Sequence, residues 1–196
     1  HGDELHWTGP NQTWNYMCAS CHSTGLEKGY DLASDSYNTT WFEIDVSCEA
    51  CHGTGSHHVA WAEAGGIATD TDKGLAVLLK SSAVWKFDEG AVTARREPPL
   101  PTHTQAESCA PCHSRRSVVS DEPFHGRPLL DTHRVSLLDE LLYYADGQIL
   151  DEVYVYGSFA QSKMYHAGVT CSDCHEPHSL TLRAQGNALC LQCHLY

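Results

Sequence analysis

The sequence predicts a small protein of mostly coil, with short α-helices and a small β-hairpin, organised around covalently bound prosthetic groups rather than an aliphatic core. Three observations predict this fold class. All ten cysteines fall into C-x-x-C-H motifs, hydrophobic residues make up only 41% of the 196 residues, and glycine or proline interrupts most segments between the motifs. We expect one domain over residues 1–196, because this length suits a single domain.

Every cysteine belongs to a pair that is followed directly by histidine. Motifs 1 to 5 cover residues 18–22, 48–52, 109–113, 171–175 and 190–194. Their cysteines are Cys18, Cys21, Cys48, Cys51, Cys109, Cys112, Cys171, Cys174, Cys190 and Cys193, and their histidines are His22, His52, His113, His175 and His194. This spacing is typical of c-type haem attachment. Two thiols two residues apart can each bind one vinyl group of a porphyrin, and the adjacent histidine can ligate the iron. The sequence therefore predicts five covalent haem c groups.

Other uses of paired cysteines fit less well. A disulfide framework does not need a histidine after every second cysteine. A zinc ribbon uses two pairs for each metal ion, so five pairs would leave one unmatched. A thioredoxin-like redox pair occurs once and needs a strand–helix context.

One haem for about 39 residues would replace much of the aliphatic core that a chain of this size normally buries. The first cysteines of successive motifs are 30, 61, 62 and 19 residues apart. Motifs 4 and 5 should therefore hold a closely spaced pair of haems, and motifs 1 and 2 should be the next closest.

The segments between the motifs contain the remaining elements. Residues 57–64 and 72–80 have helix-compatible composition and are separated by a Gly-Gly break. Residues 97–101, with three prolines, form a stiff extended linker. Residues 135–142 could form a helix, but the β-branched and aromatic residues of 141–144 and 149–156 flank a turn sequence, which favours a β-hairpin.

The chain has more histidines outside the motifs than five haems need as second axial ligands. Nine histidines lie outside the motifs, and Met17 and Met164 are the only possible thioether ligands. We therefore expect bis-histidine ligation, which gives low-spin haems of low potential. The expected distal ligands are His6, His58, His103, His133, His166 and His178. His1, His57 and His125 are weaker candidates.

The charge limits the classes of partner. Twelve Lys and Arg against 25 Asp and Glu give a formal net charge of −13, which argues against nucleic-acid binding. No apolar run reaches the roughly 18 residues of a membrane span. No signal peptide is present, so we expect a processed chain or a piece of a longer one. The N-x-T triplets at Asn11 and Asn38 would be glycosylation sites in some hosts.

Residues 14–24, 46–56, 109–116 and 168–175 resemble multihaem cytochromes of the doubled C-x-x-C-H group. This broad class includes the nitrification tetrahaem cytochrome and the haem core of hydroxylamine oxidoreductase. The likeness is closest to exported cytochromes that often carry tetratricopeptide repeats. It implies distal ligands at His58, after the Cys-His-Gly-x-Gly-Ser stretch, and at His178, in the Cys-His-x-Pro-His stretch.

These observations favour an electron conduit, located in the periplasm, at the cell surface or outside the cell, because thioether attachment normally takes place outside the cytoplasmic membrane. We expect redox partner proteins or an extracellular electron acceptor as partners. The short chain after His194 suggests that another copy covers the fifth haem, and head-to-tail contact of this kind builds filaments. The alternative is an oxidoreductase of small nitrogen or sulfur compounds with one open haem. The C-x-x-C-K motif of ammonia-forming nitrite reductases is absent from the sequence.

Overall fold

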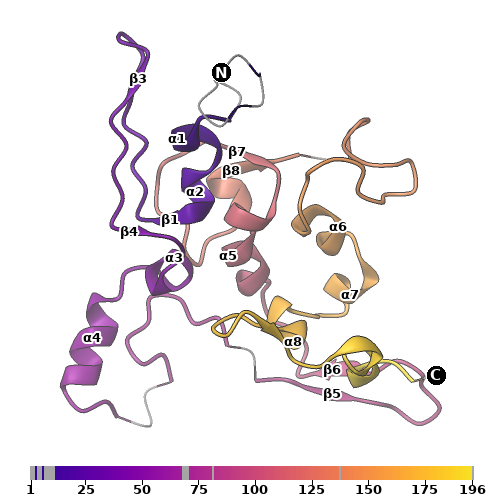
Figure 1. Cartoon of the computed structure of the whole chain (residues 1–196). Coiled ribbons are helices and arrows are strands. Elements are labelled where there is room, and N and C mark those ends of the chain that lie inside the picture. The colour runs from indigo at the N-terminus through magenta and orange to yellow at the C-terminus, as the bar shows by residue number, and fades with distance from the viewer. Residues whose placement is uncertain are drawn as a thin grey trace. The chain divides into compact units, whose positions relative to one another are not determined.

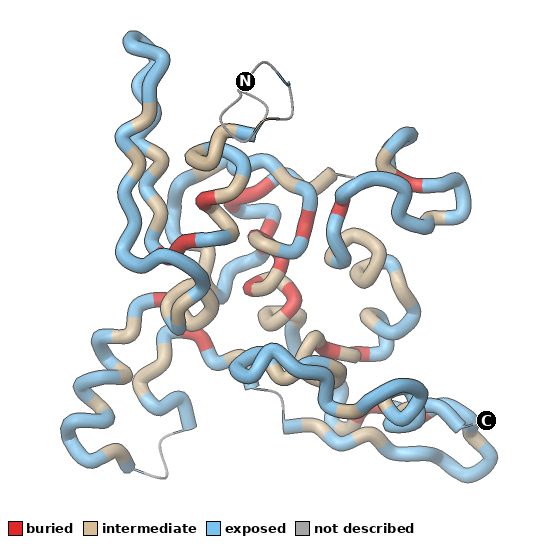
Figure 2. Tube along the Cα trace, viewed as in Figure 1, coloured by how far each residue is buried: buried red, intermediate tan, exposed pale blue. Residues whose placement is uncertain are grey.

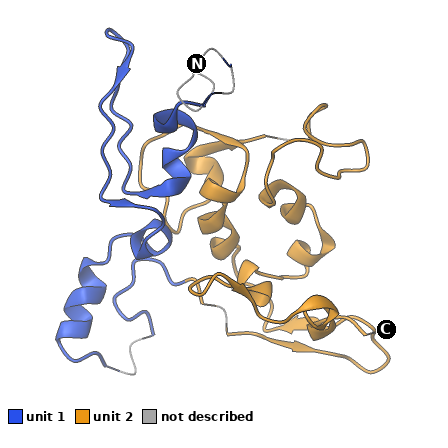
Figure 3. Ribbon diagram, in the orientation of Figure 1, with its two compact units in different colours: residues 1–78 blue, residues 79–196 orange. Residues whose placement is uncertain are grey.

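The structure is a computed structural model that describes residues 3, 6, 12–67, 71–80, 82–136 and 138–195. The chain divides into two compact units, His1–Leu78 (unit 1) and Leu79–Tyr196 (unit 2) (Figure 3). Unit 1 carries motifs 1 and 2, and unit 2 carries motifs 3, 4 and 5. The expectation of one domain stays a prediction, and each unit is described by itself.

Unit 1 consists of short helices and one long hairpin. Strand β1 pairs with β4 and β2 pairs with β3, both antiparallel, and a bridge between Glu27 and Thr40 joins the two pairs into one ladder (Figure 1). The elements are α1 (Trp14–Met17), α2 (Ala19–His22), β1 (Ser23–Thr24), β2 (Tyr30–Asp31), β3 (Ser36–Tyr37), β4 (Glu43–Ile44), α3 (Cys48–His52) and α4 (Ser56–Glu63).

Unit 2 has the same character. Its strands form three antiparallel pairs, β5·β6, β7·β8 and β9·β10. The elements are β5 (Val84–Lys86), β6 (Arg95–Glu97), α5 (Thr104–His113), β7 (Arg116–Val118), the 3₁₀-helix η2 (Leu129–Asp131), β8 (His133–Val135), α6 (Tyr156–Ala160), α7 (Lys163–His166), α8 (Cys171–Cys174), β9 (His175–Glu176), β10 (Thr181–Leu182), and the 3₁₀-helices η3 (Gly186–Ala188) and η4 (Cys190–Gln192). The predicted fold class, mostly coil with short helices and little β-structure, is confirmed, although the described residues form five two-stranded sheets and not one small hairpin.

The helix expected over residues 57–64 is confirmed as α4, which ends just before the Gly-Gly break. The helix expected over residues 72–80 is wrong. Lys73 and Gly74 both have positive φ values, of 53° and 70°, which a right-handed helix excludes. A Cβ atom at Gly74 would lie 2.6 Å from the carbonyl oxygen of His57. The close approach of α4 therefore requires glycine and imposes a turn.

The helix considered for residues 135–142 is also wrong for the described residues, because Val135 ends β8 and the segment after it is bends and turns. The hairpin expected over 141–156 forms only around its turn. Tyr143 and Ile149 form an antiparallel bridge, and the Tyr144 amide donates to the Gln148 carbonyl at 2.8 Å. No extended strand of this segment belongs to a sheet.

The aliphatic core of the described residues is small. Its buried apolar side chains are Ala19, Val77, Ala94, Ala106, Ala110, Leu129, Tyr143 and Val153. Figure 2 shows the buried residues, polar ones included, as short, separate stretches along the chain. Four of the eight are alanine, so the polypeptide alone buries few large side chains. No helix within the described residues is long and apolar enough to span a membrane.

Candidate functional site

Each motif folds as about one helical turn. Motif 1 lies at α2, motif 2 in α3, motif 3 at the end of α5, motif 4 at α8 and motif 5 at η4. Residues three apart lie on the same face of a helix. The two thiols of each motif are therefore on one face, and the histidine follows at the end of the turn.

A serine side chain closes the turn in motifs 1 and 3. The Ser23 hydroxyl donates to the carbonyl of Ala19 at 2.5 Å, and the Ser114 hydroxyl donates to the carbonyl of Ala110 at 2.7 Å. Both serines directly follow the motif histidine and are buried. They satisfy a carbonyl group that a short helix leaves without an intrahelical partner.

Motifs 1 and 2 are joined through Thr24. Its hydroxyl donates to the carbonyl of Asp45 at 2.9 Å and accepts from the amide of Ser47 at 2.9 Å. The Asp45 amide also donates to the carbonyl of His22 at 2.8 Å. These bonds hold the last residue of motif 1 close to Ser47, the residue before Cys48. The long hairpin between the two motifs therefore brings them together.

Two histidines of the motif 2 region, His52 and His58, are each oriented by a backbone carbonyl. His52 Nδ1 lies 3.1 Å from the oxygen of Val77, and His58 Nδ1 lies 2.8 Å from the oxygen of Lys73. Donation from Nδ1 to a carbonyl fixes the tautomer that carries a lone pair on Nε2, the usual arrangement of a metal-binding histidine. His58 also stacks on Trp61, with ring centroids 5.6 Å apart.

Motifs 3 and 4 contact each other through their first cysteines. A hydrogen bond with the Cys109 thiol lowers the pKa of Cys171, although burial acts in the opposite direction. The two residues are 62 positions apart in the sequence. Spacing alone predicts no contact between these motifs.

Motif 5 lies beside both motif 4 and the β5–β6 hairpin. Burial, together with the neighbouring Asp173 and Cys190, raises the pKa of Cys174. The Ala94 amide donates to the carbonyl of Cys193 at 2.7 Å, and Thr93 forms a bridge with His194. The expected proximity of motifs 4 and 5 is therefore present at Cys174 and Cys190.

The other predicted distal histidines lie in different environments. His133 is buried on β8, with Nδ1 2.8 Å from the Thr132 hydroxyl. His103 caps α5, and its ring stacks on Tyr165 at 3.8 Å between centroids. His166 ends α7 and is exposed.

His178 and His6 complete the predicted set. The His178 side chain is 81% exposed, with Nδ1 3.3 Å from Glu176. The His6 amide donates to the carbonyl of Asp3 at 3.0 Å. The assignment of each of the six histidines as a distal ligand stays a prediction. Of the two glycosylation triplets, Asn38 is exposed and Asn11 lies outside the described residues.

A group of residues around the start of α5 was not predicted from the sequence. Glu107 accepts hydrogen bonds from the Leu129 amide at 2.6 Å and from the Tyr156 hydroxyl at 3.1 Å. Burial, and then the Glu107 charge, raise the pKa values of both Tyr156 and Tyr165. These residues come from η2, α6 and α7, and no motif or periodicity connects them.

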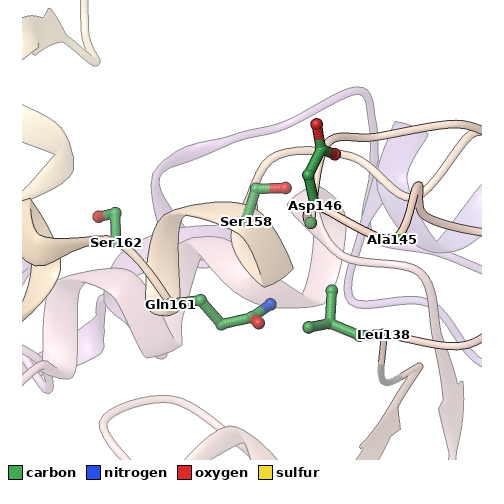
Figure 4. Close-up of a pocket in the computed structure, with 7 residues that line it drawn as sticks. Leu138, Ala145, Asp146, Ser158, Gln161 and Ser162 are labelled. Carbon is green, nitrogen blue, oxygen red and sulfur yellow. The ribbon is translucent and has the colours of Figure 1, made fainter.

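A cavity of about 390 Å³ lies beside α6. Figure 4 shows the Ser158 hydroxyl directed toward Asp146 and the Gln161 amide directed toward Leu138. Its lining is Leu138, Ala145, Asp146, Gly147, Ser158, Gln161 and Ser162. With no cysteine and no histidine among these residues, the lining offers neither a thioether bond nor an axial ligand.

The side chains present fit covalent haem. None of the ten cysteines, all of which lie within the described residues, forms a disulfide, as two thioether bonds for each motif require. The chain exposes 13789 Å². A compact protein of this mass exposes about 9,200 Å², and two separate globules of the sizes of units 1 and 2 expose about 11,000 Å². Large apolar side chains, such as Phe42 at 79% and Leu180 at 90%, contribute to this excess. Flat porphyrins would cover such a surface.

Two family models match parts of the sequence. Residues 4–53 match cytochrome c554 and c-prime, and residues 164–195 match the doubled CXXCH motif. These matches support a multihaem c-type cytochrome. Both matches include cysteines of the numbered motifs, so the cytochrome binds haem c covalently, and its family relationship suggests an electron carrier. No curated protein and no solved structure matches the chain.

Proposed function

We propose that this cytochrome is an electron conduit of five c-type haems, each with histidine on both sides of the iron. The observation that carries the proposal is the series of contacts between motifs within each unit. Thr24 joins motifs 1 and 2, the Cys109 and Cys171 thiols meet between motifs 3 and 4, and Cys190 of motif 5 lies near enough to Cys174 of motif 4 to raise its pKa. Electron transfer needs closely spaced cofactors, and haems attached to neighbouring motifs would meet this need.

A bound haem supplies an iron that alternates between the ferric and ferrous states and so carries one electron. The chain supplies the ligands and their orientation. His52 and His58, held at Nδ1 by the carbonyl groups of Val77 and Lys73, are suited to bind iron through Nε2. Two imidazole ligands on one iron leave no position for a substrate, which favours a conduit over an oxidoreductase.

The proposal extends to location and partners. Covalent haem attachment normally takes place outside the cytoplasmic membrane, so the cytochrome is exported to the periplasm, the cell surface or the medium. Its electrons pass to redox partner proteins or to an extracellular acceptor. Exposed apolar side chains such as Leu32, which is 83% exposed in the hairpin of unit 1, support self-association, with a head-to-tail filament as its extended form.

Low-temperature EPR of the air-oxidised protein tests the conduit, with spins counted against a haemochrome assay and the protein mass. We expect five haems for each chain and only low-spin signals. A high-spin signal from about one haem in five would mean an open site, and the oxidoreductase function would replace the conduit. Sedimentation and electron microscopy over a range of concentrations test self-association, and a monomer at high concentration would exclude the filament.

A further inference from the structure

Gln105 lies on α5 one helical turn before Cys109, the first cysteine of motif 3. Residues four apart lie on the same face of a helix, so Gln105 and Cys109 share a face. Across from them lies α8, the helix of motif 4, with Cys171 against Cys109. Gln105 belongs to no motif and is partly buried.

The side-chain amide of Gln105 is fully used in hydrogen bonds. Its Oε1 accepts from the amide of Ser172 at 2.8 Å, and its Nε2 donates to the Ser172 hydroxyl at 2.9 Å and to the carbonyl of Leu79 at 2.8 Å. An amide offers one acceptor oxygen and two N–H donors, a combination that a carboxylate or an ammonium group lacks. Ser172 follows Cys171 directly, so this two-point contact acts at the start of motif 4.

Helix α8 depends on such contacts for its position. It has four residues, and a helix this short is not stable by itself. Asp173 accepts from the Thr170 amide at 2.7 Å and from the Trp85 indole at 3.1 Å, which anchors the same turn from other directions. Among these bonds, only those from Gln105 connect α8 directly to the helix of motif 3.

We propose that Gln105 is a positioning residue that fixes motif 4 against motif 3 and thereby sets the electronic contact between the haems attached to these motifs. The inference rests on the proposed function, because it assumes that both motifs carry haem. Removal of the amide leaves the cysteines and axial histidines in place but releases the start of α8. The separation of the two haems then increases, and their interaction weakens.

The test compares the oxidised holoproteins of wild type, Gln105→Ala, Gln105→Glu and the control Gln161→Ala. Gln161 also donates through its side-chain amide to a backbone carbonyl, that of Gly157 at 2.7 Å, but it directly follows α6, and this bond stays within the last turn of that helix. EPR reports the interaction between neighbouring haems as a spin-coupled signal. A stepwise redox titration reports it as a separation of midpoint potentials.

We expect wild type and Gln161→Ala to show the coupled signal and Gln105→Ala to lose it, with two ordinary low-spin signals in its place. Gln105→Glu keeps the acceptor for Ser172 but not the two donors, so a partial loss is expected. If Gln105→Ala does not hold all its haems, Gln105→Glu provides the comparison. Wild-type spectra and potentials in the Gln105 variants, or no coupled signal in wild type, would overturn the proposal.

Failure of the proposed function is a separate outcome. The masses of the haem peptides show which motifs are loaded. A wild-type chain with fewer than five haems would contradict the five-haem conduit. The EPR comparison would still decide the role of Gln105 where motifs 3 and 4 both carry haem, and an unloaded motif 3 or 4 would overturn both.

Discussion

The carboxylate of Glu107 connects three elements of unit 2, and its removal should destabilise the unit. Glu107 lies on α5, accepts from the Leu129 amide in η2 at 2.6 Å and from the Tyr156 hydroxyl in α6 at 3.1 Å. Leu129 is only 1% exposed, so water cannot readily replace the lost acceptor. The substitution Glu107→Ala removes both bonds at once.

The magnitude follows from these two bonds. A buried amide without an acceptor costs about 1–3 kcal/mol, and a hydrogen bond to a charged group contributes about 1.5–3 kcal/mol. Because Glu107→Ala removes both bonds, it should lower the free energy of unfolding by roughly 3–5 kcal/mol. At this chain length, 1 kcal/mol changes Tm by about 2–4 °C, so Tm should fall by roughly 10 °C. Glu107→Gln keeps one acceptor oxygen and should show about half of this effect.

Thermal unfolding of the holoproteins, followed by near-UV and Soret circular dichroism, measures the effect, with haem content determined for each variant. Glu122→Ala is the matched control, because the Glu122 side chain is 68% exposed and its ion pair with Arg127, at 2.9 Å, is on the surface. The control should lose less than about 1 kcal/mol. Equal Tm values for Glu107→Ala and Glu122→Ala, at equal haem content, would refute the reasoning.

Three other outcomes are expected. If His58 is a distal ligand, as proposed, His58→Ala should convert one of the proposed five haems to high spin in spin-counted EPR, and an unchanged spectrum would remove His58 from the distal ligands. Burial and then Glu107 raise the pKa of Tyr156 above its ordinary value of 10.0. The neutral Tyr156 hydroxyl therefore contributes fully to the free energy of unfolding below about pH 10, and this contribution is lost as the pH rises further. The Tm should fall on the alkaline side, and it should fall less steeply in Glu107→Gln. A Tm independent of pH above 10 would contradict this. Asp173→Asn weakens the cap of α8 and should cost about 1 kcal/mol, measured by thermal unfolding; no change would show that the charge at the cap is not needed.

Local patterns predicted the chemical identity of the protein. Thioether attachment depends on a spacing of three residues, as between Cys18 and Cys21, and this spacing is visible without any structure. The sequence predicts helix α4 because residues 57–64 have helix-compatible composition and a Gly-Gly break follows them. The composition also predicted a chain with few regular elements, since haem replaces the apolar faces that normally produce a periodic pattern.

The structure was needed wherever distant segments meet. Gly74 adopts a turn because α4 approaches it, although its neighbours have helix-compatible composition. The thiol contact of Cys109 with Cys171 and the bonds of Gln105 to Ser172 join residues more than 60 positions apart. Such contacts depend on how short helices are placed by a few hydrogen bonds. The sequence alone determined which groups the chain binds, and the tertiary structure decided which motifs are neighbours, because packing between remote segments leaves no period or motif in the sequence.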